Sequence, residues 1–249
     1  SRPLPEIQAQ KYGQIETQIA RGVAQLIPSG ATLELGIGAI PDAILKALRG
    51  KEDLGLHSGM ISDAMMKLME EGVITNANKS IDGGKSVVSM ALGTSELYRW
   101  IHQNPLVSFH PSTYVHSPST ISRIKGFVAI NSALEVDLGG QANAEKIGDT
   151  IVSGIGGGLD FAQGAFNSSG GTSIIALSST ADNGATSRIV PYLKQGSPVT
   201  YHRGNVDYVV TEYGVADLRA QSLRERAERL ISIASPEFRD QLRRDNRFM

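Results

Sequence analysis

Residues 32–109 alternate between short apolar, β-rich runs and segments with helical spacing, and this alternation restricts the fold more than any other feature. Strands are predicted over residues 32–37, 54–57, 86–92 and 106–109. Helices are predicted over residues 6–27, 42–48, 61–69 and 95–102. A β-α-β-α-β-α-β succession is typical of an open, mostly parallel sheet with helices on both faces. We therefore expect an α/β fold.

After Pro118 the pattern changes, because strands follow one another closely without a crossover helix. The predicted strands are residues 127–131, 133–138, 173–177, 188–191, 199–201 and 208–211, and helices are predicted over 223–234 and 236–243. No repeat or low-complexity segment marks a boundary, so residues 1–249 are predicted to form one α/β domain with extra strands in its second half. Two prolines within Ser1–Pro5, and no initiator methionine, predict a linker that follows an upstream segment.

Charge and composition exclude several classes of protein. Lysine plus arginine number 24 against 25 aspartates plus glutamates, which argues against a nucleic-acid or anionic-membrane partner. No apolar run reaches the roughly 18 residues of a membrane span, and no signal peptide opens the chain, so we expect a cytoplasmic protein. The sequence has no cysteine, and no His/Asp/Glu cluster has the spacing of metal ligands, so no metal is expected.

The chain contains 27 glycines, and the first cluster is Gly36-Ile37-Gly38-Ala39-Ile40-Pro41, between a predicted strand and a predicted helix. Backbone N–H groups and the helix dipole there favour an anion or a developing oxyanion, although a plain tight turn fits the pattern equally well. A dinucleotide site is disfavoured, because Pro41 replaces the third glycine of G-x-G-x-x-G and Gly59 stands where an acidic residue is required.

The second cluster, Gly154-Ile155-Gly156-Gly157-Gly158, has four glycines in five residues and precedes a predicted helix that opens near Asp160. Such a loop can donate several backbone N–H bonds to a ligand, or it can be a long hairpin or crossover connection. No Walker, H-E-x-x-H or G-x-S-x-G motif is present.

Few titratable residues lie near these loops. His57 and His116 flank the predicted loop tips, and the other histidines are predicted at the surface or at strand ends: His102, His110 and His202. Glu135 and Asp137 alternate along a strand and so share one face. Glu212 ends a β-rich run and could be a buried functional carboxylate, although a structural hydrogen-bonding role is the favoured interpretation. The residues alone predict an α/β ligand-binding protein with a site suited to an anion or oxyanion.

Four segments resemble the acetyl-CoA hydrolase/transferase family, and most closely its 4-hydroxybutyrate (or butyrate/acetate) CoA-transferases: residues 36–43, 131–138, 153–161 and 206–216. The resemblance runs in order from Ser1 to Met249 and corresponds to the C-terminal half of the family's usual chain. It implies a preceding α/β domain of related fold, which is absent from this sequence, and a homo-oligomer.

The resemblance also implies a mechanism. In the family, a glutamate attacks the acyl-CoA carbonyl, and an incoming small carboxylic acid resolves the resulting glutamyl-CoA thioester. Coenzyme A and acyl-CoA are then co-substrates, with no permanently bound cofactor. The residues that the resemblance implies as backbone donors and CoA contacts are Gly36, Gly38, Ala39, Ile40, Gly156, Gly157 and Gly158.

The sequence departs from the family at two positions. The catalytic glutamate belongs to a His-Ser-Glu-Met string, which here reads His57-Ser58-Gly59-Met60, so the carboxylate is absent whether by natural decay or by a later change. His116 stands where relatives often carry an asparagine that anchors the substrate carboxylate. Three hypotheses follow: a CoA-transferase domain without its nucleophile, a non-catalytic acyl-CoA binding module, or a hydrolase that delivers water directly to the thioester.

Overall fold

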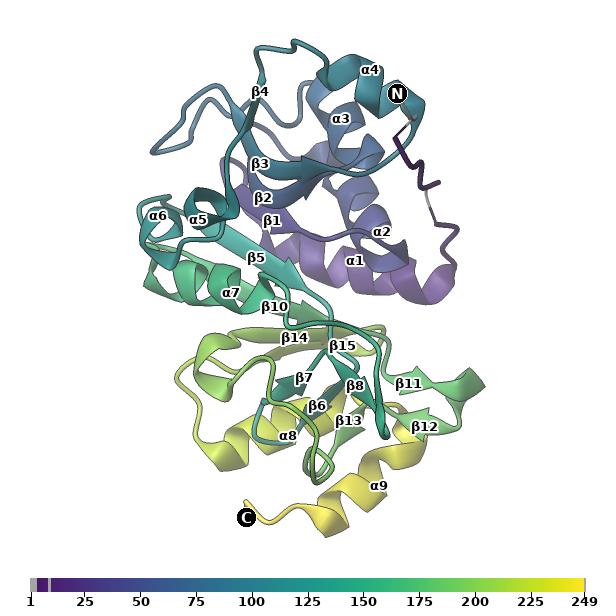
Figure 1. The fold of residues 1–249 in the computed structure, drawn as a ribbon. Coiled ribbons are helices and arrows are strands. Elements are labelled where there is room, and N and C mark those ends of the chain that lie inside the picture. The colour runs from purple at the N-terminus through teal and green to yellow at the C-terminus, as the bar shows by residue number, and fades with distance from the viewer. Residues whose placement is uncertain (1–3, 9, 249) are drawn as a thin grey trace.

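The computed structural model describes residues 4–8 and 10–248, and an eight-stranded sheet runs through it in the order β15-β14-β10-β5-β1-β2-β3-β4 (Figure 1). These strands are β1 (Thr32–Leu35), β2 (Gly55–Ile61), β3 (Ser86–Ala91), β4 (Val107–Phe109), β5 (Phe127–Asn131), β10 (Thr172–Ala176), β14 (Tyr208–Thr211) and β15 (Gly214–Asp217). Each neighbouring pair is parallel except β14 and β15. The expected open, mostly parallel α/β sheet is confirmed.

Helices cover both faces of this sheet. The first group is α1 (Gln14–Leu26), α2 (Ala39–Ala47), α3 (Asp63–Glu70) and α4 (Ser95–Ile101), and the second is α5 (Ser112–Val115), α6 (Pro118–Ile121) and α7 (Gly158–Asn167). Side chains alternate along a strand, so Val128 and Ile130 of β5 pack in the core of the first group. Phe127 and Ala129 of the same strand pack in the core of the second group.

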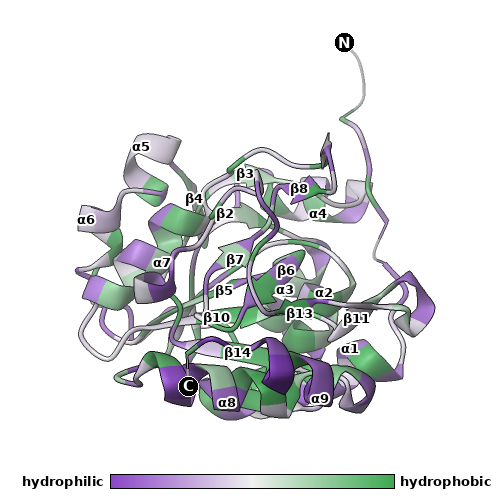
Figure 2. Cartoon of the chain, turned by 90° about the horizontal axis from the view of Figure 1, so that it is seen from below, coloured by the Kyte–Doolittle hydropathy of each residue, from purple (hydrophilic) through white to green (hydrophobic). Residues whose placement is uncertain are grey.

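The second half of the chain adds small sheets and two helices. The short strands are β6 (Glu135–Asp137), β7 (Ala142–Asn143), β8 (Lys146–Ile147), β9 (Thr150–Ile151), β11 (Thr180–Ala181), β12 (Thr186–Ser187) and β13 (Ile189–Val190). The 3₁₀ turns span Leu48–Gly50, Asp182–Gly184 and Arg203–Asn205, and the terminal helices are α8 (Leu223–Ile233) and α9 (Pro236–Asp245). Figure 2 shows hydrophilic and hydrophobic residues alternating along α8 and α9, as expected for helices that cover a core on one side.

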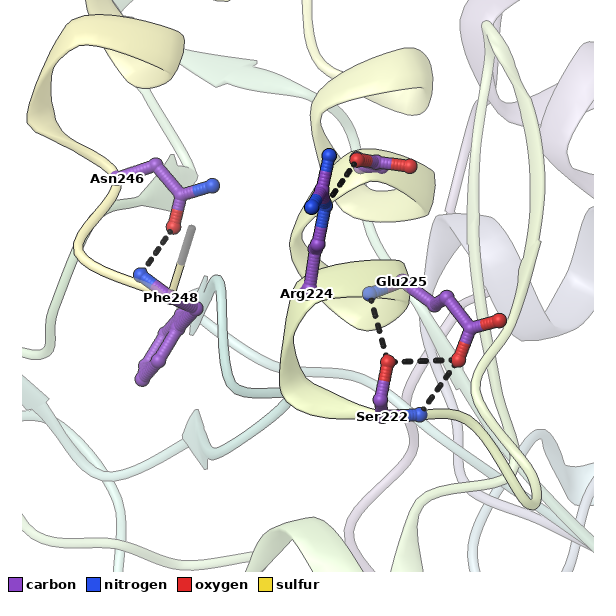
Figure 3. Close-up of polar contacts among 6 residues, drawn as sticks. Ser222, Arg224, Glu225, Asn246 and Phe248 are labelled. Atoms are coloured by element: carbon purple, nitrogen blue, oxygen red, sulfur yellow. Dashed lines mark hydrogen bonds and ion pairs between the residues drawn. The ribbon is translucent and has the colours of Figure 1, made fainter.

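The start of α8 is set by a capping box (Figure 3). The backbone N–H of Ser222 donates to Glu225 Oε2 at 2.8 Å, and the backbone N–H of Glu225 donates to Ser222 Oγ at 3.3 Å. This reciprocal pair satisfies N–H groups that the first turn of a helix leaves without intrahelical partners.

Three sequence predictions about local structure are wrong. Of the predicted helix, residues 6–8 and 10–13 are not helical, because the backbone N–H of Ile7 bonds to the carbonyl of Gly93 and α1 begins only at Gln14. Residues 199–201 do not form a strand, since only Tyr201 pairs, as an isolated bridge to Ala142. The second strand does not stop near residue 57 but continues to Ile61.

The predicted linker over residues 1–5 lies mostly outside the described residues, which begin at Leu4. At its described end, the carbonyl of Pro5 accepts a hydrogen bond from Tyr98 Oη at 2.7 Å. This bond and the Ile7–Gly93 bond hold residues 4–8 against α4 and the end of β3.

Candidate active site at the carboxyl edge of the sheet

The order in which successive strands are added to the sheet reverses between the neighbouring strands β1 and β5. From β1 the chain proceeds through α2 to β2 on one side, whereas α7 leads into β10 on the other side. Helix α2 packs with Leu33 and Leu35, while α7 packs with Phe127 and Ala129 on the opposite face. In open α/β sheets, the crevice at such a switch point, outside the carboxyl ends of the strands, is the usual place for a ligand.

Gly36 directly follows β1, and Gly59 lies within the neighbouring strand β2, both toward this edge. The pairs Thr32↔Gly55 and Leu33↔Leu56 fix the register of β1 on β2, and the same offset, continued along the strands, aligns position 36 with position 59. The hydroxyl of Ser58 donates to the carbonyl of Leu35 at 3.0 Å, which supports this continuation. On the other side of β1, Leu35 pairs with Ile130 of β5. Asn131, the last residue of β5, comes directly after this pair.

Gly59 faces the imidazole of His116. The predicted strand 54–57 stops before Gly59, but β2 continues past it to Ile61. Gly59 therefore lies within the strand, and the pleat of the strand fixes the direction in which a side chain at this position would point. A β-carbon at Gly59 would lie 3.2 Å from His116 Nε2 and 3.7 Å from Phe161 Cε2. The His116 and Phe161 rings are themselves in contact, with centroids 4.8 Å apart.

The second glycine loop reaches the same imidazole from the other side. A β-carbon at Gly157 would overlap His116 Nδ1, and one at Gly158 would overlap the Tyr201 hydroxyl and lie 2.7 Å from Asn131 Oδ1. Only glycine therefore allows the first turn of α7 to approach these side chains so closely. Gly156 adopts φ +59°, a left-handed conformation that also favours glycine.

The first turn of α7 presents free backbone donors next to His116. Gly157 is the N-cap residue and offers no side chain to cap the helix. The first N–H groups of a helix have no intrahelical acceptor and carry the positive end of its dipole. This turn is therefore suited to stabilise a negative oxygen that develops on a bound carbonyl.

Ile37 and Gly38 of the first glycine loop line a separate hollow. Gly38, the N-cap of α2 with φ 130°, lines a hollow with Gln10, Asp42, Asp63 and Gly93. Burial raises the pKa of Asp42, and the neighbouring Asp63 carboxylate acts in the same direction. Ala39 and Ile40 begin α2 beside this acidic hollow, which disfavours an anion there.

The structure thus brings together Gly59, His116, Gly157 and Gly158. Gly38 lines the acidic hollow, and Ala39 and Ile40 follow it at the start of α2. Gly36, directly after β1, has open space around it. Gly156 follows the same loop but has open space around it. Of the two glycine clusters that the sequence singles out, the second makes the contacts with polar side chains.

His57 positions the segment that carries His116. The His57 side chain is fully buried, and its Nε2–H donates to the carbonyl of Val115 at 2.9 Å. Burial lowers the pKa of His57 to about 4, so the imidazole is neutral at neutral pH. His57 therefore fixes the backbone directly before His116.

The pKa of His116 is also lowered by burial, while the Asp160 carboxylate on α7 acts in the opposite direction. The imidazole is half-buried and, because its pKa lies below the ordinary value, neutral at neutral pH. A neutral imidazole can accept a proton from a neighbouring group.

Glu34 is a buried carboxyl group that the sequence analysis missed. Its side chain is 5% exposed, and Asn131 Nδ2 donates to its Oε2 at 3.1 Å. Burial raises the pKa of Glu34 to about 8, so this group is protonated at neutral pH. The signal was a charged residue within the apolar run Leu33-Glu34-Leu35, on the strand face opposite the two leucines.

The other carboxylates considered from sequence are engaged in structural hydrogen bonds. Glu212 accepts from the backbone N–H and the hydroxyl of Ser179, at 2.9 and 2.6 Å. Asp137 accepts from the backbone N–H groups of Gly139 and Gln141, both at 2.9 Å. Glu135 accepts from Asn143 Nδ2 at 3.1 Å.

The described part of the chain has neither a cluster of metal ligands nor a membrane-spanning helix. Within residues 4–8 and 10–248, no group of three or more His, Cys, Asp or Glu side chains is arranged to hold a metal ion. Among the helices described, none combines the length and apolarity that crossing a membrane requires.

Several known proteins are similar to this chain along almost its whole length. The 4-hydroxybutyrate coenzyme A transferase of Clostridium kluyveri is 50% identical over 242 residues, which cover 97% of this chain and 56% of that enzyme. The succinyl-CoA:cyclohexane-1-carboxylate CoA transferase of Geobacter metallireducens is 45% identical and covers 96% of this chain and 55% of its own length. The chain thus spans a little over half the length of these relatives.

Solved structures give the same result. The structure of 4-hydroxybutyrate CoA-transferase from Porphyromonas gingivalis is 43% identical, with a TM-score of 0.87 over 98% of this chain and 57% of its own. RipA from Yersinia pestis is 38% identical, with a TM-score of 0.90 over 98% of this chain and 54% of its own. Residues 93–246 match the acetyl-CoA hydrolase/transferase C-terminal domain, and the chain belongs to the acetyl-CoA hydrolase/transferase family.

Proposed function

We propose that this chain is the C-terminal, thioester-binding part of a CoA-transferase, which moves CoA between short-chain acyl-CoA and carboxylic acids of the 4-hydroxybutyrate, butyrate or acetate type. The observation that carries the proposal is the meeting of Gly59, His116 and the Gly157–Gly158 turn at the switch point of the sheet. Relatives that bear the names of such enzymes support the substrate class. Coenzyme A enters as a co-substrate, and we place the reaction in the cytoplasm.

In this proposal the thioester carbonyl lies against the first turn of α7. Attack on the carbonyl carbon moves negative charge onto its oxygen, and fixed N–H donors stabilise that charge without rearrangement. Gly157 and Gly158 allow the carbonyl to approach the backbone because they carry no β-carbon.

The nucleophile of the transfer belongs, by resemblance, at position 59. Gly59 supplies no carboxylate, and Glu34, the buried carboxyl group on the neighbouring strand, is protonated at neutral pH and bonded to Asn131. The protein therefore positions a thioester but does not accept its acyl group, and transfer stays near background.

The first experiment introduces Gly59→Glu, which restores the carboxylate, into the full-length protein. The β-carbon would meet the His116 ring at 3.2 Å, so a small displacement of that ring accommodates it. We expect acyl transfer from butyryl-CoA to acetate to rise by roughly a thousandfold or more. The matched control is Gly50→Glu, at a glycine with open space around it. Equal transfer by the Gly59→Glu variant and the unmodified protein would refute the assignment of position 59.

A second candidate function is a non-catalytic acyl-CoA binding module, which the absent carboxylate at Gly59 favours. The two functions differ in covalent chemistry. After incubation of the Gly59→Glu variant with acyl-CoA, intact-protein mass spectrometry detects a trapped glutamyl adduct if the chain is a transferase domain without its nucleophile, and none if it is a binding module. Calorimetric titration with CoA and butyryl-CoA measures binding separately, and absence of binding would overturn both.

A further inference from the structure

The side chain that touches position 59 is itself a base. His116 Nε2 lies on the Gly59 side of the ring and Nδ1 on the Gly157 side. Resting on the acyl-CoA site proposed above, we propose that His116 is the general base of a direct hydrolysis of acyl-CoA, in which water takes the place of the missing glutamate.

The geometry around His116 suits this role. The rings of His57, His110 and His202 are engaged in hydrogen bonds to Val115, Ser108 and Gly204. Within the residues that the structure describes, the half-buried His116 ring makes no such bond. Contact with Phe161 fixes the ring, and Gly59 leaves the volume beside Nε2 free of a side chain.

The electrostatic surroundings keep the ring ready to accept a proton. Asp160 on α7 is the carboxylate whose charge acts on His116 and stabilises its protonated form. His57 on β2 is neutral at neutral pH, and Glu34 on β1 is neutral below about pH 8. His57 on β2 and Glu34 on β1 are therefore both uncharged at pH 7.

The reaction balances with water as the only other reactant. The water oxygen bonds to the thioester carbonyl carbon while one water proton moves to His116 Nε2. The resulting oxyanion lies against the N–H groups of the first turn of α7. When the tetrahedral intermediate collapses, the C–S bond breaks, and the CoA sulfur takes the proton from the imidazolium. The products are the free carboxylic acid and CoA.

The test measures free CoA released from butyryl-CoA in a buffer without any carboxylate acceptor, with the protein as its gene encodes it. The 249 residues contain no cysteine, so a thiol reagent reads CoA without background from them. We expect His116→Asn to lower the release by roughly a hundredfold or more, the range of a lost general base. The matched control His102→Asn, at an exposed histidine, should leave it unchanged.

Two further readouts separate a base from a packing residue. In the unmodified protein the rate of CoA release should fall as the pH drops below the ordinary pKa range of imidazole. In His116→Asn this fall in rate at low pH should be absent. Imidazole added to the buffer should restore part of the activity of His116→Ala.

The failure of this proposal can be told from the failure of the proposed function. If butyryl-CoA binds but no CoA is released, or if release is the same in His116→Asn, His116 is not the base, although the acyl-CoA site stands. If butyryl-CoA does not bind, the proposed function itself is wrong.

Discussion

The two glycine loops are alike in sequence and different in surroundings. Each precedes a helix that has a glycine N-cap. The loop before α2 follows β1 of the large sheet, whereas the loop before α7 follows β9 of a separate two-stranded sheet. The loop before α2 faces a hollow that contains Asp42 and Asp63. The loop before α7 is pressed against His116, Asn131 and Tyr201. A glycine cluster therefore predicts that other groups can approach the backbone closely. Whether the loop binds a ligand depends on which side chains surround it.

The largest effect should come from adding one methyl group to the α7 loop. In Gly157→Ala the new β-carbon overlaps His116 Nδ1, so either the imidazole or the helix must move. We expect CoA-thioester turnover, measured in the Gly59→Glu background, to fall by roughly a hundredfold. Gly154→Ala, in the same loop but with open space around it, is the control and should retain turnover. Equal activities would contradict the close contact between the loop and His116.

Glu34→Gln tests the buried carboxyl group beneath the α7 loop. The pKa of Glu34 is raised from 4.5 to about 8, so the folded state holds a proton that the unfolded state loses between these values. The unmodified protein should therefore lose stability as pH rises through this window, relative to the variant, by a few kcal/mol. Urea unfolding of both proteins from pH 5 to 9 checks this, and a constant difference between them would show that Glu34 does not titrate.

Substitutions of His57 test whether this residue supports the segment that carries His116. Its contribution to stability depends on pH in the opposite direction to that of Glu34. Because the folded-state pKa is lowered to about 4, the unfolded state binds the extra proton, and stability is lost as pH falls below the ordinary imidazole value. His57→Leu leaves the Val115 carbonyl without its donor, which should cost about 1–3 kcal/mol in unfolding free energy. His57→Gln retains a donor, and we expect it to recover most of that loss while removing the acid limb.

The smallest effect should come from a site remote from both loops. Ser222→Ala removes the hydroxyl that caps α8 and should cost about 1 kcal/mol of unfolding free energy. Binding of butyryl-CoA, measured by calorimetry, should not change. A change in affinity would mean that general stability, and not the α7 loop, governs the site.

The sequence predicted the sheet well because its strands are apolar runs separated by helical spacing, as at Leu33–Leu35 and Phe127–Asn131. It failed where tertiary contacts replace local preference. Residues 6–13 have helical spacing, yet Ile7 bonds to Gly93, and the single bridge of Tyr201 to Ala142 does not extend into a strand. Periodicity carries no information on such long-range partners.

The candidate site was only partly predictable, for a related reason. Gly59, His116 and Gly157 were each singled out, but their contact depends on the register of β2 and on how α5 and α7 pack. Glu34 was missed because a single charged residue in an apolar run is recognised as important only when its neighbours are known. Its hydrogen-bond partner Asn131 and its electrostatic neighbour Tyr201 lie 97 and 167 residues away along the chain.

The placement of α2 and α7 on opposite faces has a consequence for how this edge can vary. Helix α2 is anchored in one hydrophobic core and α7 contributes Phe161 and Ala165 to another. Changes to the acidic hollow and changes to the residues that contact His116 should then combine additively, since they share few packing partners. Substitutions can therefore accumulate beside α2 while the contacts between α7 and His116 keep their geometry.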